Sequence, residues 1–272
     1  MYLLIGLRMK LGVYRLSAML LASVFVQAPV AAATQHQLDI GFTDLGGLDE
    51  SFLGARYRYF AEDLEPKTGP YELRAYLNRV NNYAVGGFSN GDFSYLNIDA
   101  AVYGPEGLVM QASLQRISDD NKYWQDTDYL ASAALGKQMN EQLQLGFNAY
   151  YSRAESDYNN GKQSTEHVSV EWTYAPYVRW TDIDNNQGWD LELKQLAGRY
   201  RYVQGRAIYY VNQAWSVGFI ANIRNTDNLS DNYELQTQYW FNKHAALKFG
   251  LGSALDSGSG LNSMSLLLTM RL

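Results

Sequence analysis

Few residues of this chain are of types that carry out catalysis or hold a metal. Among its 272 residues there is no cysteine, which excludes disulfides, thiolate zinc sites and cysteine nucleophiles. The three histidines, His36, His167 and His244, are far apart in the sequence. His167 and Ser169 fall on one face of an expected strand and could seed a hydrolase site, but no nucleophile elbow accompanies them. We therefore expect no enzyme, no cofactor and no metal.

The acidic segment 118–128 (SDDNKYWQDTD) is the one other place where an ion could bind. Its carboxylates are oxygen ligands of the kind that calcium takes. It lacks the glycine and the spaced glutamate of an EF-hand loop, so we expect a solvated loop here.

Charged side chains on the polar faces of the expected strands are the stronger candidates for function. The predicted pore-lining residues are Arg56, Arg58, Asp99, Glu171, Asp190, Glu192, Lys194, Arg224, Glu234 and Lys248, with Asp39 and Arg271 on the first and last strands. Acids and bases that face one another across an aqueous lumen would tune ion selectivity. The alternative is that they satisfy one another inside a plugged barrel. The segment 64–77 (LEPKTGPYELRAYL) is the one we expect to fold inward or to lie as a short helix at the rim.

These side chains must be positioned by strands, because the chain after residue 33 repeats with a period of two. In the run 142–151, apolar residues take one face while glutamine, glycine and asparagine take the other. No composition break divides residues 34–272, so we predict a single domain. We predict about 14 antiparallel strands (12–16 if 172–206 differs), near 37–43, 51–60, 80–88, 92–103, 107–117, 127–137, 141–154, 164–175, 188–196, 200–210, 214–224, 232–241, 245–254 and 260–271.

Three features favour a transmembrane β-barrel over a soluble sandwich or barrel. Many predicted strands have about 10 residues, which is the length that crosses a bilayer. The polar faces carry no second apolar core, and aromatic residues cluster at strand ends, as in membrane-interface girdles. The net charge of −6 lacks the basic footprint of nucleic-acid binding, so we expect no nucleic-acid partner.

Residues 1–33 have the three parts of a secretory signal peptide. Arg8, Lys10 and Arg15 form a basic region, an apolar stretch follows, and 31–33 offers small residues for cleavage. The apolar stretch is too short to span a bilayer comfortably, so we predict cleavage after Ala33 rather than an anchor. Removing this segment leaves a chain of net charge −9.

The loop lengths alternate along the chain, which predicts its orientation. Short turns are expected at 104–107, 138–141, 211–213 and 242–244, and longer polar loops at 118–127, 152–164, 225–231 and 256–260. Bacterial outer-membrane barrels have short periplasmic turns and longer external loops, so both termini are expected in the periplasm. The last strand, 260–271, resembles the C-terminal signal of the barrel-assembly machinery, although it ends in Leu272 instead of an aromatic residue.

One segment carries a family resemblance. Residues 57–89 hold a tyrosine-rich strand, then Gly69-Pro70, then Leu77-Asn78-Arg79 before another alternating strand. This pattern resembles the general bacterial porins of Gram-negative proteobacteria. The resemblance covers about 33 residues. It implies an outer-membrane porin but names no solute.

Two functions remain open from the sequence. The first is a porin for passive diffusion of small hydrophilic solutes and ions. The second is a structural or adhesive barrel whose external loops bind ligands. Either would contact outer-membrane lipid and lipopolysaccharide and would need the barrel-assembly machinery, and either is compatible with a homo-oligomer.

Overall fold

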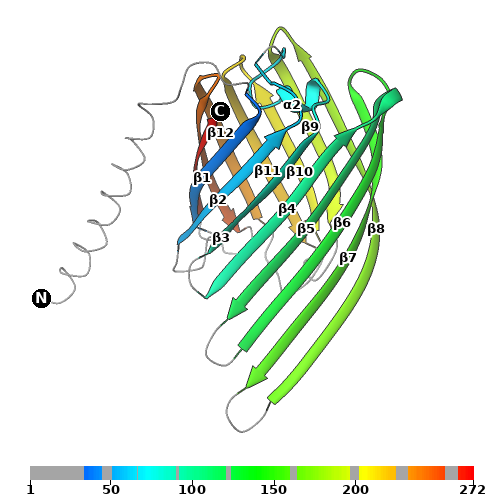
Figure 1. Ribbon diagram of the computed structural model, residues 1–272, viewed down its shortest axis with the longest axis vertical. Coiled ribbons are helices and arrows are strands. Elements are labelled where there is room, and N and C mark those ends of the chain that lie inside the picture. Colours follow the sequence, from blue (N-terminus) through cyan, green and yellow to red (C-terminus); the bar gives the residue numbers. More distant parts are fainter. Residues whose placement is uncertain are drawn as a thin grey trace, which may run out of the picture. The chain divides into compact units, whose positions relative to one another are not determined.

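Fourteen antiparallel strands form a closed barrel (Figure 1). This computed structural model describes residues 34–44, 51–65, 67–89, 92–120, 124–159, 164–196, 202–224, 232–254 and 263–272. The strands are β1 (His36–Asp44), β2 (Ser51–Phe60), β3 (Asn82–Ser89), β4 (Phe93–Tyr103), β5 (Leu108–Asp120), β6 (Trp124–Gln138), β7 (Leu143–Asn159), β8 (Ser164–Asp184), β9 (Gln187–Leu196), β10 (Tyr202–Tyr210), β11 (Trp215–Arg224), β12 (Asn232–Asn242), β13 (Ala245–Ala254) and β14 (Ser263–Arg271). Each strand pairs with its neighbours in sequence, and β1 pairs with β14.

The predicted all-β barrel and its count of 14 strands are confirmed. The predicted signal peptide, residues 1–33, lies outside the described residues, as do the expected loops 225–231 and 256–260. In the part of the chain that the structure describes, no helix is long and apolar enough to cross a membrane.

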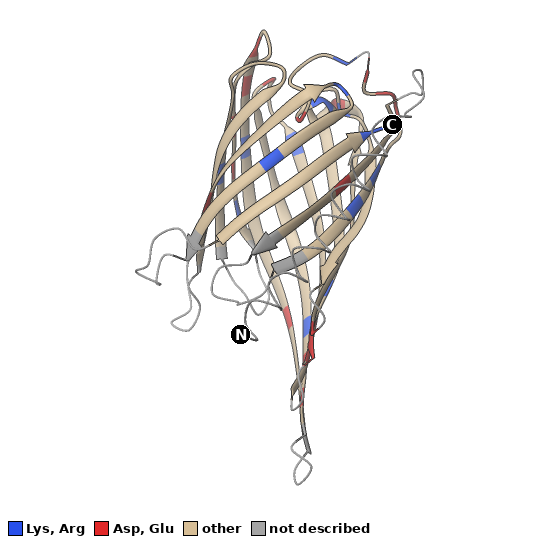
Figure 2. Cartoon of the chain, turned by 90° about the vertical axis from the view of Figure 1, so that its left-hand side faces the viewer, with Lys and Arg blue, Asp and Glu red and all other residues tan. Residues whose placement is uncertain are grey.

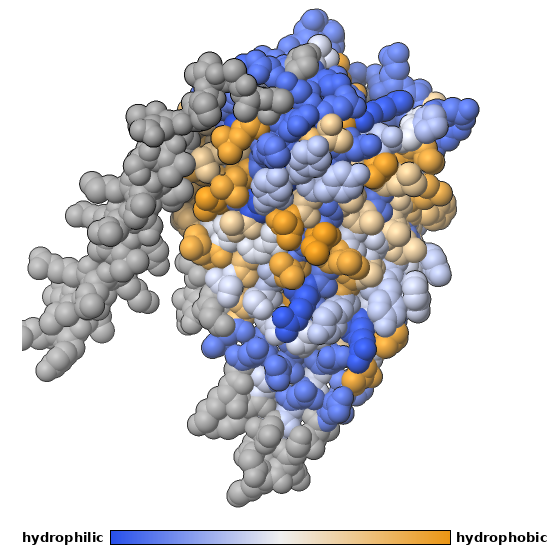
Figure 3. Space-filling view, in the orientation of Figure 1, coloured by the Kyte–Doolittle hydropathy of each residue, from blue (hydrophilic) through white to orange (hydrophobic). Residues whose placement is uncertain are grey.

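The period of two places apolar side chains on the outer face of the barrel. Leu53, Phe147 and Tyr174 have exposed fractions of 68%, 67% and 72%. Figure 3 shows hydrophobic residues around the middle of the visible face, between more hydrophilic regions above and below. Lipid would cover such a band, because the tails are as apolar as these side chains. Most of the wall carries no charge in Figure 2.

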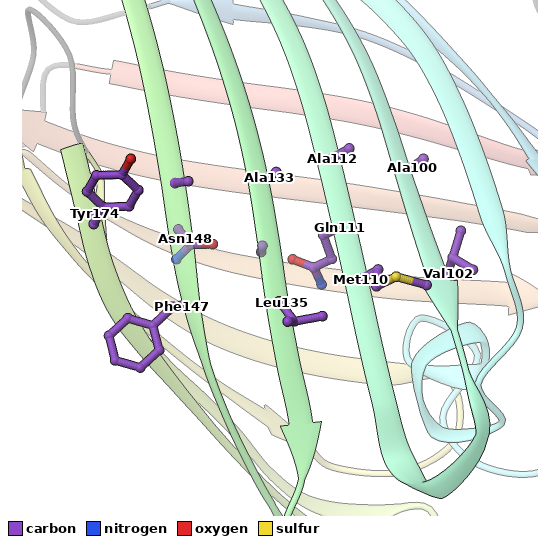
Figure 4. A pocket seen from close by; sticks show the side chains of 12 residues that line it. Ala100, Val102, Met110, Gln111, Ala112, Ala133, Leu135, Phe147, Asn148 and Tyr174 are labelled. Atoms are coloured by element: carbon purple, nitrogen blue, oxygen red, sulfur yellow. The ribbon is translucent and has the colours of Figure 1, made fainter. Parts of the chain in front are cut away.

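A shallow apolar groove of about 540 Å³ lies on this outer face (Figure 4). Ala100, Ala112 and Ala133 form part of it, and Phe147 and Tyr174 stand beside them. These residues share the outer face with exposed side chains of neighbouring positions, so the groove belongs to the lipid-facing surface and not to the lumen.

The two ends of the barrel differ. At one end, named here the turn end, short turns join the strand pairs β4–β5, β6–β7, β8–β9, β10–β11 and β12–β13, while a longer connection, 61–81, joins β2 to β3. The first residues of β1 pair with the last residues of β14 at this end. The turn end is at the top of Figure 1, and we name the opposite end the loop end. Asn185 and Asn186 join β8 to β9 with φ angles of 48° and 68°, values that asparagine tolerates in tight hairpins.

The strands on one side of the barrel are longer than predicted. β7 has 17 residues and β8 has 21, and both extend past the other strands at the loop end (Figure 1). The predicted loops 118–127 and 152–164 are therefore wrong over most of their length, because strand pairing continues through them. The predicted end of the strand at 175 is also wrong. Pro176 lies inside β8, opposite Phe147, although a proline donates no ladder hydrogen bond.

Candidate functional site

The connection between β2 and β3, residues 61–81, folds into the turn end of the barrel. We name it the inner segment. It contains the short helix α2 (Arg74–Leu77), and the left-handed backbone of Gly69, at φ 100°, turns the chain before Pro70. Its Leu73 packs against Ile208 and Tyr210 on the inner wall of β10. The sequence predicted that 64–77 would either fold inward or lie as a short helix at the rim; the segment holds a short helix, and its Leu73 reaches the inner wall.

Hydrogen bonds fasten the inner segment to strands around the barrel. The backbone N–H of Tyr71 donates to the carbonyl of Gln213 at 2.9 Å. The Nη1 of Arg271 on β14 donates to the carbonyl of Tyr71 at 2.7 Å, and its guanidinium lies 4.1 Å from the centre of the Trp240 ring. Arg271 therefore holds the inner segment against the barrel wall.

Two further side chains of the inner segment reach the wall. Ser216 of β11 donates to Glu72 Oε2 at 2.8 Å. The guanidinium of Arg179 on β8 lies 3.4 Å from the centre of the Tyr76 ring, a cation–π contact. The segment thus contacts β8, β10, β11 and β14, and it crosses the mouth of the barrel (Figure 1).

Arg74 holds the inner segment together from within. Its guanidinium donates to the carbonyls of Gly69, at 3.2 Å, and Leu64, at 3.3 Å, and it lies over the ring of Tyr71. Burial lowers the pKa of Arg74, while Tyr71 and Glu65 oppose that shift. The buried cation is stabilised by carbonyl dipoles and an aromatic face, so the segment has a defined shape.

Beneath the inner segment lies a polar cavity of about 570 Å³, which we name the lumen cavity. Glu72, Leu73, Ala75 and Tyr76 of the inner segment form one end of it. Its charged lining residues are five bases and three acids: Arg56, Arg58, Arg179, Lys194, Arg206, Glu72, Asp99 and Glu192. The lining is thus net basic, in a chain that is net acidic overall.

A buried carboxylate, Asp190, binds two of these five bases. Asp190 is fully buried, and Arg179 binds it with two hydrogen bonds of 2.7 and 2.9 Å. Arg206 donates to Asp190 Oδ2 at 2.8 Å and to Glu192 Oε2 at 3.2 Å. Lys194 pairs with Glu192 at 3.1 Å. Three bases therefore share two acids, and the fork of Arg179 matches its carboxylate.

On the other side of the cavity, Arg56 forms an ion pair with Asp99, to which Asn97 donates at 2.8 Å. Arg56 on β2 reaches across β3 to β4, and the strand between them carries Gly86 at this level. A Cβ on Gly86 would lie 2.7 Å from the Cβ of Arg56, so only glycine leaves this path open.

The structure places the other predicted pore-lining residues in different surroundings. Glu234 and Lys248 line a second interior cavity, of about 420 Å³, together with Asp39 and Arg56. Glu171 lines neither of these cavities and accepts a hydrogen bond from Thr173 at 3.1 Å. The side chain of Arg224 lies outside the described residues.

Sequence analysis missed several residues of the lumen cavity. Arg179 fell between the predicted strands 164–175 and 188–196, and Arg206, although within the predicted strand 200–210, was not among the residues predicted to line the lumen. The signal was present: Arg179 alternates with Tyr177 and Thr181, all on the inner face. The contacts of Tyr76 with Arg179 carried no sequence signal, because they join segments about a hundred positions apart.

The chemistry-bearing residues considered first do not assemble a site. His167 and Ser169 lie on β8 opposite Ser156 and Ala154, and both are exposed. Within the described ranges, no group of three histidine, aspartate or glutamate side chains is placed to hold a metal ion.

Comparisons with known proteins agree with this architecture. No protein-family model matches the chain, and no curated protein matches it in sequence. The structure is similar to that of outer membrane protein Omp33 of Acinetobacter baumannii, with a TM-score of 0.62 and 14% identity over 88% of this chain and 98% of that one. It is more distantly similar to the toluene transporter TodX of Pseudomonas putida, with a TM-score of 0.44 and 9% identity over 90% and 89% of the two chains.

The chain is therefore a closed antiparallel β-barrel whose fold is similar to that of outer membrane protein Omp33. At 14% identity, the likeness to Omp33 defines the fold alone.

Proposed function

We propose that this chain is an outer-membrane channel through which small hydrophilic solutes and ions diffuse passively. The observation that carries the proposal is the pair of interior cavities, of about 570 and 420 Å³, which share Arg56 in their linings. They lie at successive levels of a 14-stranded barrel, which is wider than the 8-stranded barrels that side chains fill. The inner segment then sets the narrowest part, at the turn end.

Single-channel recording in planar bilayers tests this proposal directly. The folded barrel should insert and give discrete, ohmic current steps in potassium chloride. A heat-unfolded sample of the same protein serves as the control. Verified insertion without current steps would refute a channel.

The orientation and processing form part of the proposal. Residues 1–33 would be cleaved on export, and the turn end, with both termini, would face the periplasm. The apolar band would contact lipid and lipopolysaccharide, and β14 would be bound by the barrel-assembly machinery. A homo-oligomer would use the same outer face.

Protease treatment of intact cells should cleave the β7–β8 hairpin and spare the turn end.

The projecting β7–β8 hairpin favours one other function, an adhesive barrel with ligand-binding external strands. Its strands of 17 and 21 residues exceed the 9–11 that a membrane crossing needs. Residues 154–169 can be replaced by Asn-Gly, because Arg153 and Val170 face each other across the pair. The shortened barrel should conduct as before if the channel is the function. Adhesion would be supported if neither the wild type nor the shortened barrel conducts and only the shortened barrel fails to attach cells to a surface.

A further inference from the structure

One cation of the lumen cavity stands apart from the others. Arg58 lines the cavity beside Arg56, yet its guanidinium forms no ion pair and no hydrogen bond with any residue in the described ranges. Its Nε is covered by protein and has no partner. A charged group shielded from water is costly unless another group compensates it. Because Arg58 lines the lumen cavity, a solute in that cavity could supply the partner.

The acids that act electrostatically on Arg58 already have other hydrogen-bond or ion-pair partners. Asp99 and Asp39 act on it electrostatically. Asp99 is held by Arg56 and Asn97, and Asp39 accepts hydrogen bonds from Gln37 and Thr269, the latter at 2.7 Å. The other bases of the cavity share Asp190 and Glu192 on the far side. Within the described residues, Arg58 is thus a basic group of this cavity that no acid holds by an ion pair or a hydrogen bond.

The cavity wall formed by β5, β6 and β7 is uncharged and offers hydrogen-bonding groups. Its polar side chains include Gln111, Ser113, Ser132 and Asn148. Ser113 and Ser132 bond to each other at 2.8 Å, and the buried Nδ2 of Asn148 has no partner. Amide and hydroxyl groups of this kind bind the hydroxyls of a solute, whereas a guanidinium fork binds a carboxylate or phosphate.

We propose that the lumen cavity is a binding site for a small hydroxylated organic anion, with the carboxylate or phosphate of the solute on Arg58. A cavity of about 570 Å³ is within the usual range for small-molecule sites. The inner segment closes one side of this site through Tyr76 and Glu72. The inference rests on the proposed channel function, since it names the class of solute that would pause in the lumen.

Calorimetric titration of the whole folded barrel in detergent tests the site without requiring conduction. The probes are D-gluconate and D-glucose 6-phosphate, with D-glucose as the uncharged comparison. At least one of the two anions should bind saturably and D-glucose should not. Arg58→Gln should weaken that binding at least tenfold, about 1.4 kcal/mol. Arg58→Lys should give an intermediate value, because it keeps the charge and loses the fork.

Arg116→Gln is the matched control, since Arg116 lies on the outer face beside Leu114 and Tyr129. It should bind as the wild type does. Each variant is first checked for the folded, unboiled form by gel mobility. If neither anion binds, or if Arg58→Gln binds as tightly as the wild type, the site is refuted, whatever the bilayer recordings give. Binding in a barrel that passes no current would support the site while refuting the channel.

Discussion

At the residue scale, the lumen contains two kinds of charge. Most are compensated: Arg56 by Asp99, and Arg179 and Arg206 by Asp190. Compensated pairs hold the wall together and contribute little field along the barrel. An entering ion is influenced by the excess positive charge. This excess arises because bases outnumber acids in the lining of the lumen cavity.

This excess leads to a prediction about selectivity. Arg56→Glu with Arg58→Glu replaces two positive charges by two negative ones on the inner face of β2. Permeability should shift toward cations, because the lining of the lumen cavity becomes net acidic. Reversal potentials under a salt gradient measure the shift. Arg116→Glu on the outer face serves as the control and should leave the reversal potential unchanged. An unchanged value in the double variant would remove these arginines from the ion path.

A second prediction at this scale concerns stability. Asp190→Asn leaves the guanidiniums of Arg179 and Arg206 without their shared carboxylate. Breaking a buried ion pair by removing one partner typically costs about 3–5 kcal/mol. The free energy of unfolding, from urea titrations in lipid vesicles followed by tryptophan fluorescence, should fall by that order.

Glu62→Gln provides the comparison for Asp190→Asn. Glu62 pairs with Lys67, and its side chain is 57% exposed. The loss of an exposed pair of this kind should cost less than about 1 kcal/mol. Equal losses in the two variants would contradict the structural role assigned to Asp190.

At the element scale, the inner segment is the part that distinguishes this barrel from an open cylinder. Its buried Leu73 and its contacts with β8, β10, β11 and β14 hold it across the mouth. A loop that stayed at the rim would leave Tyr210 and Ile208, which are 1% and 2% exposed, open to the lumen.

Loosening the inner segment should therefore raise conductance. Glu72→Ala combined with Tyr76→Ala removes the hydrogen bond from Ser216 and the contact with Arg179. We expect single-channel conductance to increase severalfold while the barrel remains folded. Lys67→Gln is the control, because Lys67 pairs with Glu62 inside the segment and not with the wall. Conductance equal to that of the wild type in the double variant would mean that the segment does not limit the flow.

At the scale of the whole molecule, the closed ladder of hydrogen bonds sets the behaviour in solution. The mature chain refolded in detergent micelles should be mostly β by circular dichroism and should migrate differently on gels before and after boiling. Membrane barrels resist unfolding because their backbone groups are all paired. A helical spectrum, or a monomer soluble without detergent, would contradict the barrel.

Much of this architecture could be predicted from the sequence, because alternation directly encodes which side of a wall a residue takes. That is why the strand count was correct. Alternation also placed Arg56, Arg58 and Lys194 on the polar faces of their strands, and all three line the lumen cavity; that they line a conducting pore stays a prediction. Alternation continues beyond the membrane, however, so the ends of β7 and β8 could not be placed from it. The contact of Tyr76 with Arg179 could not be predicted, since it depends on how the inner segment folds into the barrel. The partners of Asp190, Arg179 and Arg206, lie on the two neighbouring strands, and they depend on strand registers that alternation does not set.

The pairing of β1 with β14 differs from every other pairing in the described sheet. All the other pairs join strands that follow one another, whereas Gln37 and Arg271 are 234 residues apart in the chain. Hairpins can therefore form one after another from local contacts, but the last joint must wait until both ends of the sheet are built. Until then two unpaired edges are exposed, and such edges promote aggregation. The pairing of β1 with β14 is thus the slow step of folding, and the chain is prone to aggregate until it is complete.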